Sequence, residues 1–278
     1  KPGISAMVAD IVPQKYRVEA FGILRIGANA GWAIGPAIGG FLMVISYWLL
    51  FLVTAAASLI GTVLIVLFIE ESSHTQAAQR FDLPKVFDAG RDRGFLVFCG
   101  FSFLLFLVMG QFASTLSVFS TEFVGISDVQ LGIVYTLNGI IVVFFQWPAA
   151  LIGGKIGTRR ALTLGAILFG AGYFTVGLAH SFYFLLGSMT VITLGEVIFA
   201  PSATTAVANS APEGKMGRYM GFFGLAEALG WSAGPFIGGW LIDYLSKKPV
   251  LLWGAIAAIA VTAAIGFSYS GRVRKQVA

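Results

Sequence analysis

The sequence predicts an all-α protein that crosses a membrane many times. Its 278 residues are 57% hydrophobic and only 11% charged, with a mean hydropathy of +0.86. A soluble domain carries about 25% charged residues, so this composition cannot cover a water-facing surface. Eight apolar runs are each long enough to span a bilayer, which takes about 20 residues. A long, gapless internal repeat further indicates two structurally equivalent halves.

The predicted spans are separated by short polar loops and one long polar stretch. No run shows the sustained alternation of a strand, so each is expected to form a helix. The spans cover residues 21–45, 49–69, 94–119, 130–152, 161–179, 182–207, 219–244 and 250–270. Residues 1–12 are apolar but too short to cross a bilayer. We therefore divide the chain into residues 1–69 (the remainder of an N-terminal helical bundle), 70–93 (a linker) and 94–278 (a C-terminal six-helix bundle).

The repeat places one glycine-rich motif in each half. Residues 31–40 read GWAIGPAIGG, and residues 230–239, which lie 199 positions further on, read GWSAGPFIGG. Residues 2–42 and 201–241 share 13 identities in 41 positions. Glycines four residues apart form one helix face on which another backbone can pack closely, and the proline is expected to bend the helix. The motif residues are Gly31, Gly35, Pro36, Gly39, Gly40, Gly230, Gly234, Pro235, Gly238 and Gly239.

The basic residues are distributed unevenly between the two sides of the predicted membrane domain. Fourteen of the 18 Lys and Arg residues fall in the loops and tail of one side, whereas Lys247 and Lys248 fall in the opposite loops. This asymmetry predicts a cell-membrane protein whose linker and C-terminus are cytoplasmic. It also explains the net charge of +5 without nucleic acid, which is not an expected partner.

The repeat also predicts helices upstream of the chain. The second half begins near Gly94, and its counterpart of Pro2 is Pro201. The first half is therefore expected to continue for about 105 residues before Pro2, enough for three helices and part of a fourth. On this reading the chain holds the last eight and a half helices of a twelve-helix protein, and the missing N-terminal helices are expected partners.

Several motifs resemble those of the major facilitator superfamily, in particular its drug:proton antiporter branch. GWAIGPAIGG resembles the Gly-Pro-x-x-Gly-Gly motif on the fifth helix of that branch. Two loops are also similar to family loops, namely the loop after helix four (Asp10, Pro13, Arg17, Ala20 and Gly22) and the loop after helix eight (Gly154, Arg159 and Arg160). The tenth helix and the loop after it resemble the same branch at Gly195, Glu196, Pro201, Ala208, Asn209 and Pro212.

The resemblance implies two six-helix bundles that transport by alternating access, without a cofactor. Helices four, seven and ten, here residues 1–12, 94–119 and 182–207, would line a central cavity. Helices five, eight and eleven, which include both glycine motifs, would form the gating interface between the bundles. A cytoplasmic latch would be formed by Asp10, Arg17, Arg159, Arg160 and Asn209.

Two carboxylates inside the apolar runs are candidates for binding a proton or a substrate. Glu196 lies in the middle of its run, and Glu227 lies two turns before Gly234. A charge in a membrane span is expensive, and it usually faces a bundle interior or a water-filled cavity. The alternative for each is a packed, hydrogen-bonded structural role. For Glu196, loss of solvation predicts exchange of protons near physiological pH, in competition with a cationic substrate.

Uncharged polar residues in the same runs complete the candidate site. Gln111, Asn138, Gln146 and Thr193 could each hydrogen-bond a substrate, or could instead bond a neighbouring helix. No metal site is expected, because the chain has a single cysteine, and both histidines lie in predicted loops.

These features favour a secondary active transporter, most consistent with proton-coupled efflux of small amphipathic compounds across the lipid bilayer. A proton-coupled symporter for a small polar nutrient is the first alternative, and an arginine-rich cavity would favour it. A membrane-embedded enzyme would require clustered His, Cys or paired Asp within the bilayer, which the sequence does not show. An inactive or partner-dependent fragment is the remaining alternative.

Overall fold

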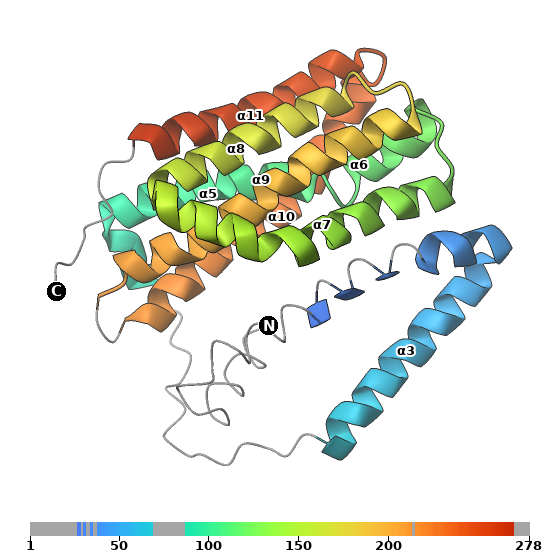
Figure 1. Ribbon diagram of the computed structural model, residues 1–278, viewed down its shortest axis with the longest axis horizontal. Coiled ribbons are helices and arrows are strands. Elements are labelled where there is room, and N and C mark those ends of the chain that lie inside the picture. The colour runs from blue at the N-terminus through green and yellow to red at the C-terminus, as the bar shows by residue number, and fades with distance from the viewer. Residues whose placement is uncertain are drawn as a thin grey trace. The chain divides into compact units, whose positions relative to one another are not determined.

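The computed structural model describes residues 27–68, apart from positions 29, 32, 33, 36 and 37, and residues 87–212 and 215–269. All regular structure in this part of the chain is helical, as the sequence predicts (Figure 1). Asp10, Arg17 and Pro36 lie outside the described residues, as do residues 1–12 and most of the linker. The expectations for these residues, and for the structural equivalence of the two repeat copies, therefore stay predictions.

The helices follow the predicted spans to within a few residues, with one interruption. The long helices are α3 (Tyr47–Phe68), α5 (Arg93–Gly110), α7 (Asp128–Ile156), α8 (Thr158–Val176), α9 (Phe182–Ser210), α10 (Met216–Leu245) and α11 (Pro249–Tyr269). The span predicted over residues 94–119 is present as Arg93–Phe123, but its helix is not continuous. There, α5 is followed by a turn over residues 111–114, a short helix α6 (Thr115–Val118) and a π-helix η3 (Phe119–Phe123).

In the part of the chain that the structure describes, five helical segments are both long and apolar enough to cross a membrane. They are Tyr47–Phe68, Arg93–Phe123, Asp128–Ile156, Phe182–Ser210 and Pro249–Tyr269. The other two predicted spans of the second half also form long helices, of 19 residues in α8 and 30 residues in α10. Both are less apolar, because α8 begins with two arginines and α10 carries Arg218, Glu227 and Asp243.

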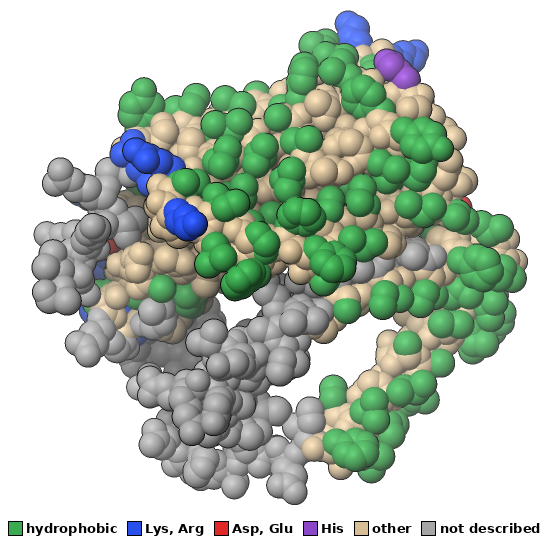
Figure 2. All heavy atoms as spheres, in the orientation of Figure 1, with side chains coloured by type: hydrophobic (Ala, Val, Ile, Leu, Met, Phe, Trp, Pro, Cys, Tyr) green, Lys and Arg blue, Asp and Glu red, His purple; other side chains and the backbone are tan. Residues whose placement is uncertain are grey.

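Residues Asp82–Ser127 and Phe144–Ala278 form one compact unit, called here the C-terminal bundle. Within it α11 packs between α8 and α5, α9 packs on α8, and α10 packs on α5 (Figure 1). Helices α9 and α10 also touch, so this row of helices closes into a ring. Figure 2 shows hydrophobic side chains covering the sides of the bundle, with Lys and Arg side chains gathered toward its ends.

The interior of the C-terminal bundle is filled largely by aromatic rings. Trp253 of α11 stacks on Tyr173 of α8 with ring centroids 5.7 Å apart, and Phe119 meets Trp253 edge-on at 5.4 Å. Phe169 and Phe199 continue these ring contacts from α8 to α9. Such pairs contribute about 0.5–1.5 kcal/mol each beyond the area they bury. Packing of this kind holds helices together in lipid, where the hydrophobic effect between helices is absent.

Glycines allow α8 and α9 to approach closely. A Cβ atom at Gly172 would lie 2.7 Å from the backbone nitrogen of Ile192, and a Cβ atom at Gly195 would lie 2.9 Å from the carbonyl oxygen of Gly165. Side chains at these positions would therefore push the two backbones apart. Because Gly195 immediately precedes Glu196, this contact fixes the rotation of α9 at the candidate proton site.

The other compact unit comprises residues Lys1–Phe81 and Asp128–Val143. None of the 22 residues of α3 is buried, although the helix is almost entirely apolar. Its large side chains are open along its whole length, with 75% of the surface of Trp48 and 77% of that of Phe68 exposed. Such a surface fits contact with lipid or with further protein.

Candidate functional site

Glu196 is the one charged residue among the 29 residues of α9, and it is half-buried. Thr193, almost one turn earlier, is completely buried, and its Oγ1 donates a hydrogen bond of 2.8 Å to the carbonyl oxygen of Met189. Thr193 is thus engaged with its own helix, as is common for hydroxyl groups inside helices. This contact does not require a substrate, so a binding role for Thr193 stays a prediction.

Gln146 connects α7 to α9 directly beside Glu196. Its Nε2 donates a hydrogen bond of 3.0 Å to the carbonyl oxygen of Val197. In an unbroken helix this oxygen would accept from the N–H of residue 201, but Pro201 has no N–H. Gln146 therefore supplies the donor that Pro201 cannot, which is how neighbouring helices make proline tolerable in a membrane helix.

Gln111 makes a similar connection between α5 and α10. It is completely buried at the point where α5 ends, and its Nε2 donates to the carbonyl oxygens of Leu107 (3.0 Å) and Gly234 (2.8 Å). Its Oε1 accepts a hydrogen bond of 2.6 Å from Thr115 Oγ1 at the start of α6. These bonds join both sides of the interrupted helix to α10, next to Pro235. The sequence predicts two roles for Gln111, and these bonds favour the interhelical role over substrate binding.

The second glycine motif packs α10 against α5. A Cβ atom at Gly234 would lie 2.6 Å from the carbonyl oxygen of Leu107 and 2.9 Å from Cα of Gly110. Gly230 lies equally close to α5 one turn earlier, and a side chain at Gly238 would overlap those of Gln111 and Thr115. The predicted close helix contact is thus present, and its partner is α5 of the same bundle. A gating role is not needed to explain these glycines and stays a prediction.

The first glycine motif has fewer neighbours in the described part of the chain. No described atom lies within 4 Å of a Cβ atom built at Gly31 or Gly35, and Gly39 reaches only Leu50 at 4.0 Å. Gly40 lies against the backbone at the start of α7. In the second motif, Gly239 also has no described atom within 4 Å.

Two further candidates lie on other helices than Glu196. Glu227 is half-buried in α10, and among the described residues no hydrogen bond or ion pair is recorded for its side chain. Asn138 is buried, with 6% of its surface exposed, but it lies in the part of α7 that belongs to the other compact unit. The candidate site described here therefore consists of Glu196, Gln146 and Pro201.

Comparison with known proteins identifies the family. Residues 1–145 and again residues 98–276 match the Major Facilitator Superfamily, and together these two matches cover almost the whole chain. The chain belongs to the major facilitator superfamily. It is therefore a multi-pass membrane transporter protein with the fold that the motifs predict, and the family comprises transporters rather than enzymes.

Relatives with curated names include drug-resistance proteins. Over 277 residues the chain is 26% identical to an uncharacterised major-facilitator-type transporter, YttB, of Bacillus subtilis, covering 98% of this chain and 69% of the relative. It is 27% identical to Multidrug resistance protein 1 of the same organism, with 96% and 69% covered. It is 23% identical to Quinolone resistance protein NorA of Staphylococcus aureus, with 98% and 68% covered.

Solved structures share the fold. A POT family transporter, whose crystal structure was solved with a thioalcohol-conjugated peptide, superposes with a TM-score of 0.67 at 16% sequence identity. The match covers 95% of this chain and 71% of that transporter. At this identity the likeness concerns the fold alone.

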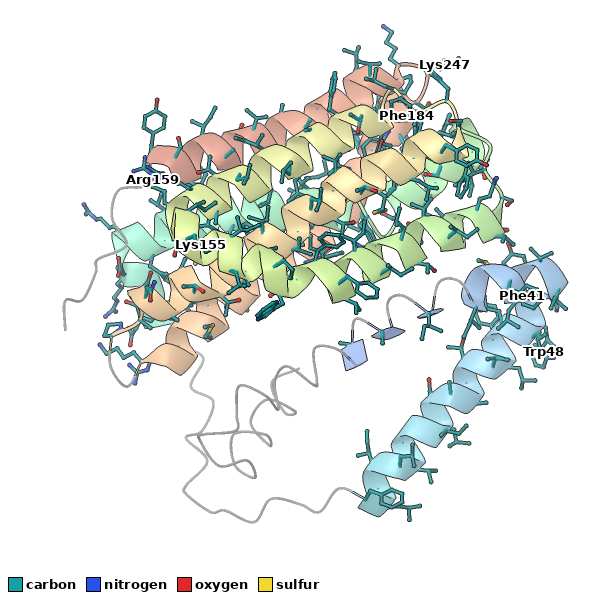
Figure 3. All side chains as sticks on the ribbon, in the orientation of Figure 1. Phe41, Trp48, Lys155, Arg159, Phe184 and Lys247 are labelled. Carbon is teal, nitrogen blue, oxygen red and sulfur yellow. The ribbon has the colours of Figure 1, made fainter. Side chains whose placement is uncertain are left out.

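The described members of the predicted latch lie at the ends of helices of this major facilitator protein. Arg159 and Arg160 are exposed at the start of α8, and Asn209 is exposed at the end of α9. Figure 3 shows Lys155 and Arg159 at one end of the C-terminal bundle and Lys247 at the opposite end. No ion pair within the described residues includes Arg159 or Arg160. The latch, whose other members are not described, stays a prediction.

Asp92 is a residue that sequence reasoning missed. Its Oδ1 accepts hydrogen bonds from the backbone N–H groups of Gly94 (3.0 Å) and Phe95 (3.2 Å), so it caps the start of α5. Its Oδ2 accepts a hydrogen bond of 3.4 Å from the Tyr219 hydroxyl of α10. An aspartate immediately before an apolar run is an N-cap signal that the sequence contained. Asp92 thus joins the linker end to two helices.

Replacing Asp92 with Ala is expected to lower the thermal unfolding midpoint in detergent by roughly 2–4 °C, because an N-cap contributes about 1 kcal/mol. The matched control is Asp88→Ala, which removes an exposed carboxylate paired with Arg91 at 3.4 Å. Exposed pairs contribute little, so this control should unfold within about 1 °C of the parent chain. Equal shifts in both variants would contradict the capping role of Asp92.

Proposed function

We propose that this protein is a proton-coupled exporter of small amphipathic compounds. Protons and a lipophilic substrate, most simply a cation, would compete for the Glu196 carboxylate as the protein alternates between its inward-open and outward-open states. Protonation would neutralise the site and release the cation, and loss of the proton would restore the site. No covalent step is required.

The observation that carries the proposal is the position of Glu196. It is the sole charged residue in a 29-residue apolar helix. It is half-buried in the bundle, close to the point where Pro201 removes a backbone hydrogen bond of that helix. Ionisable residues inside membrane spans are commonly found along ion and substrate pathways. Two of the relatives are named for multidrug and quinolone resistance, which supports this substrate class for the present chain.

The direction and coupling of transport test the proposal against a nutrient symporter. Everted membrane vesicles containing the protein together with its expected N-terminal helices should accumulate the cationic dye ethidium when their interior is acidified. A protonophore should abolish this accumulation, because it removes the proton gradient. Uptake of a polar sugar or amino acid by right-side-out vesicles, with no movement of ethidium in either orientation, would favour the symporter and contradict the proposal.

We further propose that the end of the C-terminal bundle bearing Lys155 and Arg159 faces the cytoplasm (Figure 3). Cytoplasmic loops of membrane proteins are enriched in Lys and Arg, and the loops at this end are the more basic ones. An impermeant thiol reagent applied to intact cells should then label a Ser246→Cys variant and spare a Thr158→Cys variant. The native Cys99 is buried, so the reagent should not label it in either variant. Labelling of Thr158→Cys alone would reverse the orientation.

A further inference from the structure

The carbonyl oxygen of Val197 occupies a special place in α9. It follows Glu196 directly, and it is the oxygen that Pro201 leaves without its normal helical donor. An unpaired carbonyl group in an apolar environment is unfavourable, because no water is present to bond it. Gln146 Nε2 lies 3.0 Å from this oxygen and comes from a different helix. The ladder of α9 is thus completed at this point by a side chain of α7.

A second contact shows that α7 also packs against α9 on the C-terminal side of Pro201. A Cβ atom at Gly153 would lie 3.2 Å from Ser202 Oγ, which itself donates 2.8 Å to the carbonyl oxygen of Ile198. Gln146 and Gly153 are seven residues apart, about two turns, so they lie on the same face of α7. This face therefore borders α9 on both sides of Pro201.

A related arrangement occurs in the C-terminal bundle, where a glutamine bonds a different oxygen close to a helical proline. Gln111 of α5 donates to the carbonyl oxygen of Gly234, immediately before Pro235 of α10. The oxygen that Pro235 leaves without a donor belongs to Trp231, and a Cβ atom at Gly110 would lie 3.1 Å from it. Each proline inside α9 and α10 thus faces a glutamine-bearing segment of a neighbouring helix.

We propose that Gln146 is a positioning residue for the transport reaction: by completing the α9 hydrogen-bond ladder at Pro201, it fixes where Glu196 stands relative to α7. The inference rests on the proposed role of Glu196, but its first test does not. Gln146 acts through the α9 backbone and need not touch the transported compound. Its effect should therefore depend on Pro201.

A double-mutant cycle with Pro201 tests this dependence. Gln146→Met keeps the length of the side chain and removes the donor, so it should lower the thermal unfolding midpoint of the full chain in detergent by roughly 2–4 °C. Pro201→Ala restores an N–H group for the carbonyl oxygen of Val197. In that background Gln146→Met should change the midpoint by less than about 1 °C. Equal losses in both backgrounds would overturn the inference, because Gln146 would then act independently of Pro201.

Ethidium transport by the same variants distinguishes positioning from packing and from substrate binding. A positioning role predicts that Gln146→Met lowers turnover at least ~3-fold with an unchanged KM for ethidium. The loss should shrink to less than ~2-fold when the double variant is compared with Pro201→Ala alone. A raised KM in both backgrounds would assign Gln146 to substrate binding, and unchanged turnover would leave it a structural contact only. Either result would overturn the inference.

Two further variants separate a folding defect from a loss of the proposed function. If Gln146→Met does not accumulate in the membrane, Gln146→Asn shortens the donor arm instead and should show the same dependence on Pro201. Glu196→Gln tests the proposed function alone. If Glu196→Gln transports normally while the stability cycle shows the expected coupling, the proposed function fails, and the tie between Gln146 and Pro201 stands as structural only.

Discussion

Replacing Glu196 with Gln is expected to abolish proton-driven efflux. The amide has nearly the shape of the carboxyl group, so packing in α9 should be retained, but it can neither take up a proton nor carry a charge. Ethidium accumulation in acidified everted vesicles should fall at least about tenfold, which corresponds to about 1.4 kcal/mol in the transport barrier. Glu196→Asp, which keeps the titrating group on a shorter arm, should retain part of the activity.

The matched control removes a carboxylate of the same bundle outside the site. Asp243 is exposed near the end of α10, so Asp243→Asn should leave ethidium transport close to that of the parent protein. Glu227 provides the opposing test, because it is the other carboxylate that the sequence makes a candidate for proton binding. If Glu227→Gln stops transport and Glu196→Gln does not, the proton site lies on α10 and not on α9.

Replacing Gly234 with Ala is expected to destabilise the folded protein strongly. The added carbon would lie 2.6 Å from the carbonyl oxygen of Leu107 and 2.9 Å from Cα of Gly110, and both are backbone atoms that cannot rotate away. Overpacking of this kind costs about 1–3 kcal/mol, so the unfolding midpoint in detergent should fall by several degrees, roughly 3–10 °C.

Gly239 is a control from the same motif and the same helix. No described atom lies within 4 Å of a Cβ atom built there. Ala at this position gains up to about 1 kcal/mol of helix propensity, so Gly239→Ala should be neutral or stabilising. If Gly234→Ala unfolded no earlier than Gly239→Ala, the close contact between α10 and α5 would not exist in the folded protein.

The fold could be predicted from the sequence because membrane helices have a strong local signal. Length and apolarity identified α3, α7, α9 and α11 to within a few residues, since lipid leaves a spanning chain almost no alternative to a helix. The interruption after Gly110 could not be found in this way. It depends on Gln111 forming bonds with Leu107, Gly234 and Thr115, which lie on three separate helices once the chain has folded.

The site was predictable only in part, for a similar reason. Glu196 stands out in the sequence because it is an isolated charge in an apolar run. The partner of Gln146 is a backbone oxygen 51 residues away, and no side-chain pattern marks a carbonyl group. One signal was available: a proline within a helix always leaves the oxygen four residues earlier without a donor, which here is that of Val197. Which residue supplies the donor depends on tertiary packing.

Proton release on ligand binding tests the role of Glu196 most directly. Ethidium added to the purified protein in weakly buffered detergent should release protons, because the cation displaces the proton held by this carboxyl group. We expect proton release by the parent protein and by Asp243→Asn, and none by Glu196→Gln at saturating ethidium. Undiminished proton release by Glu196→Gln would contradict this role.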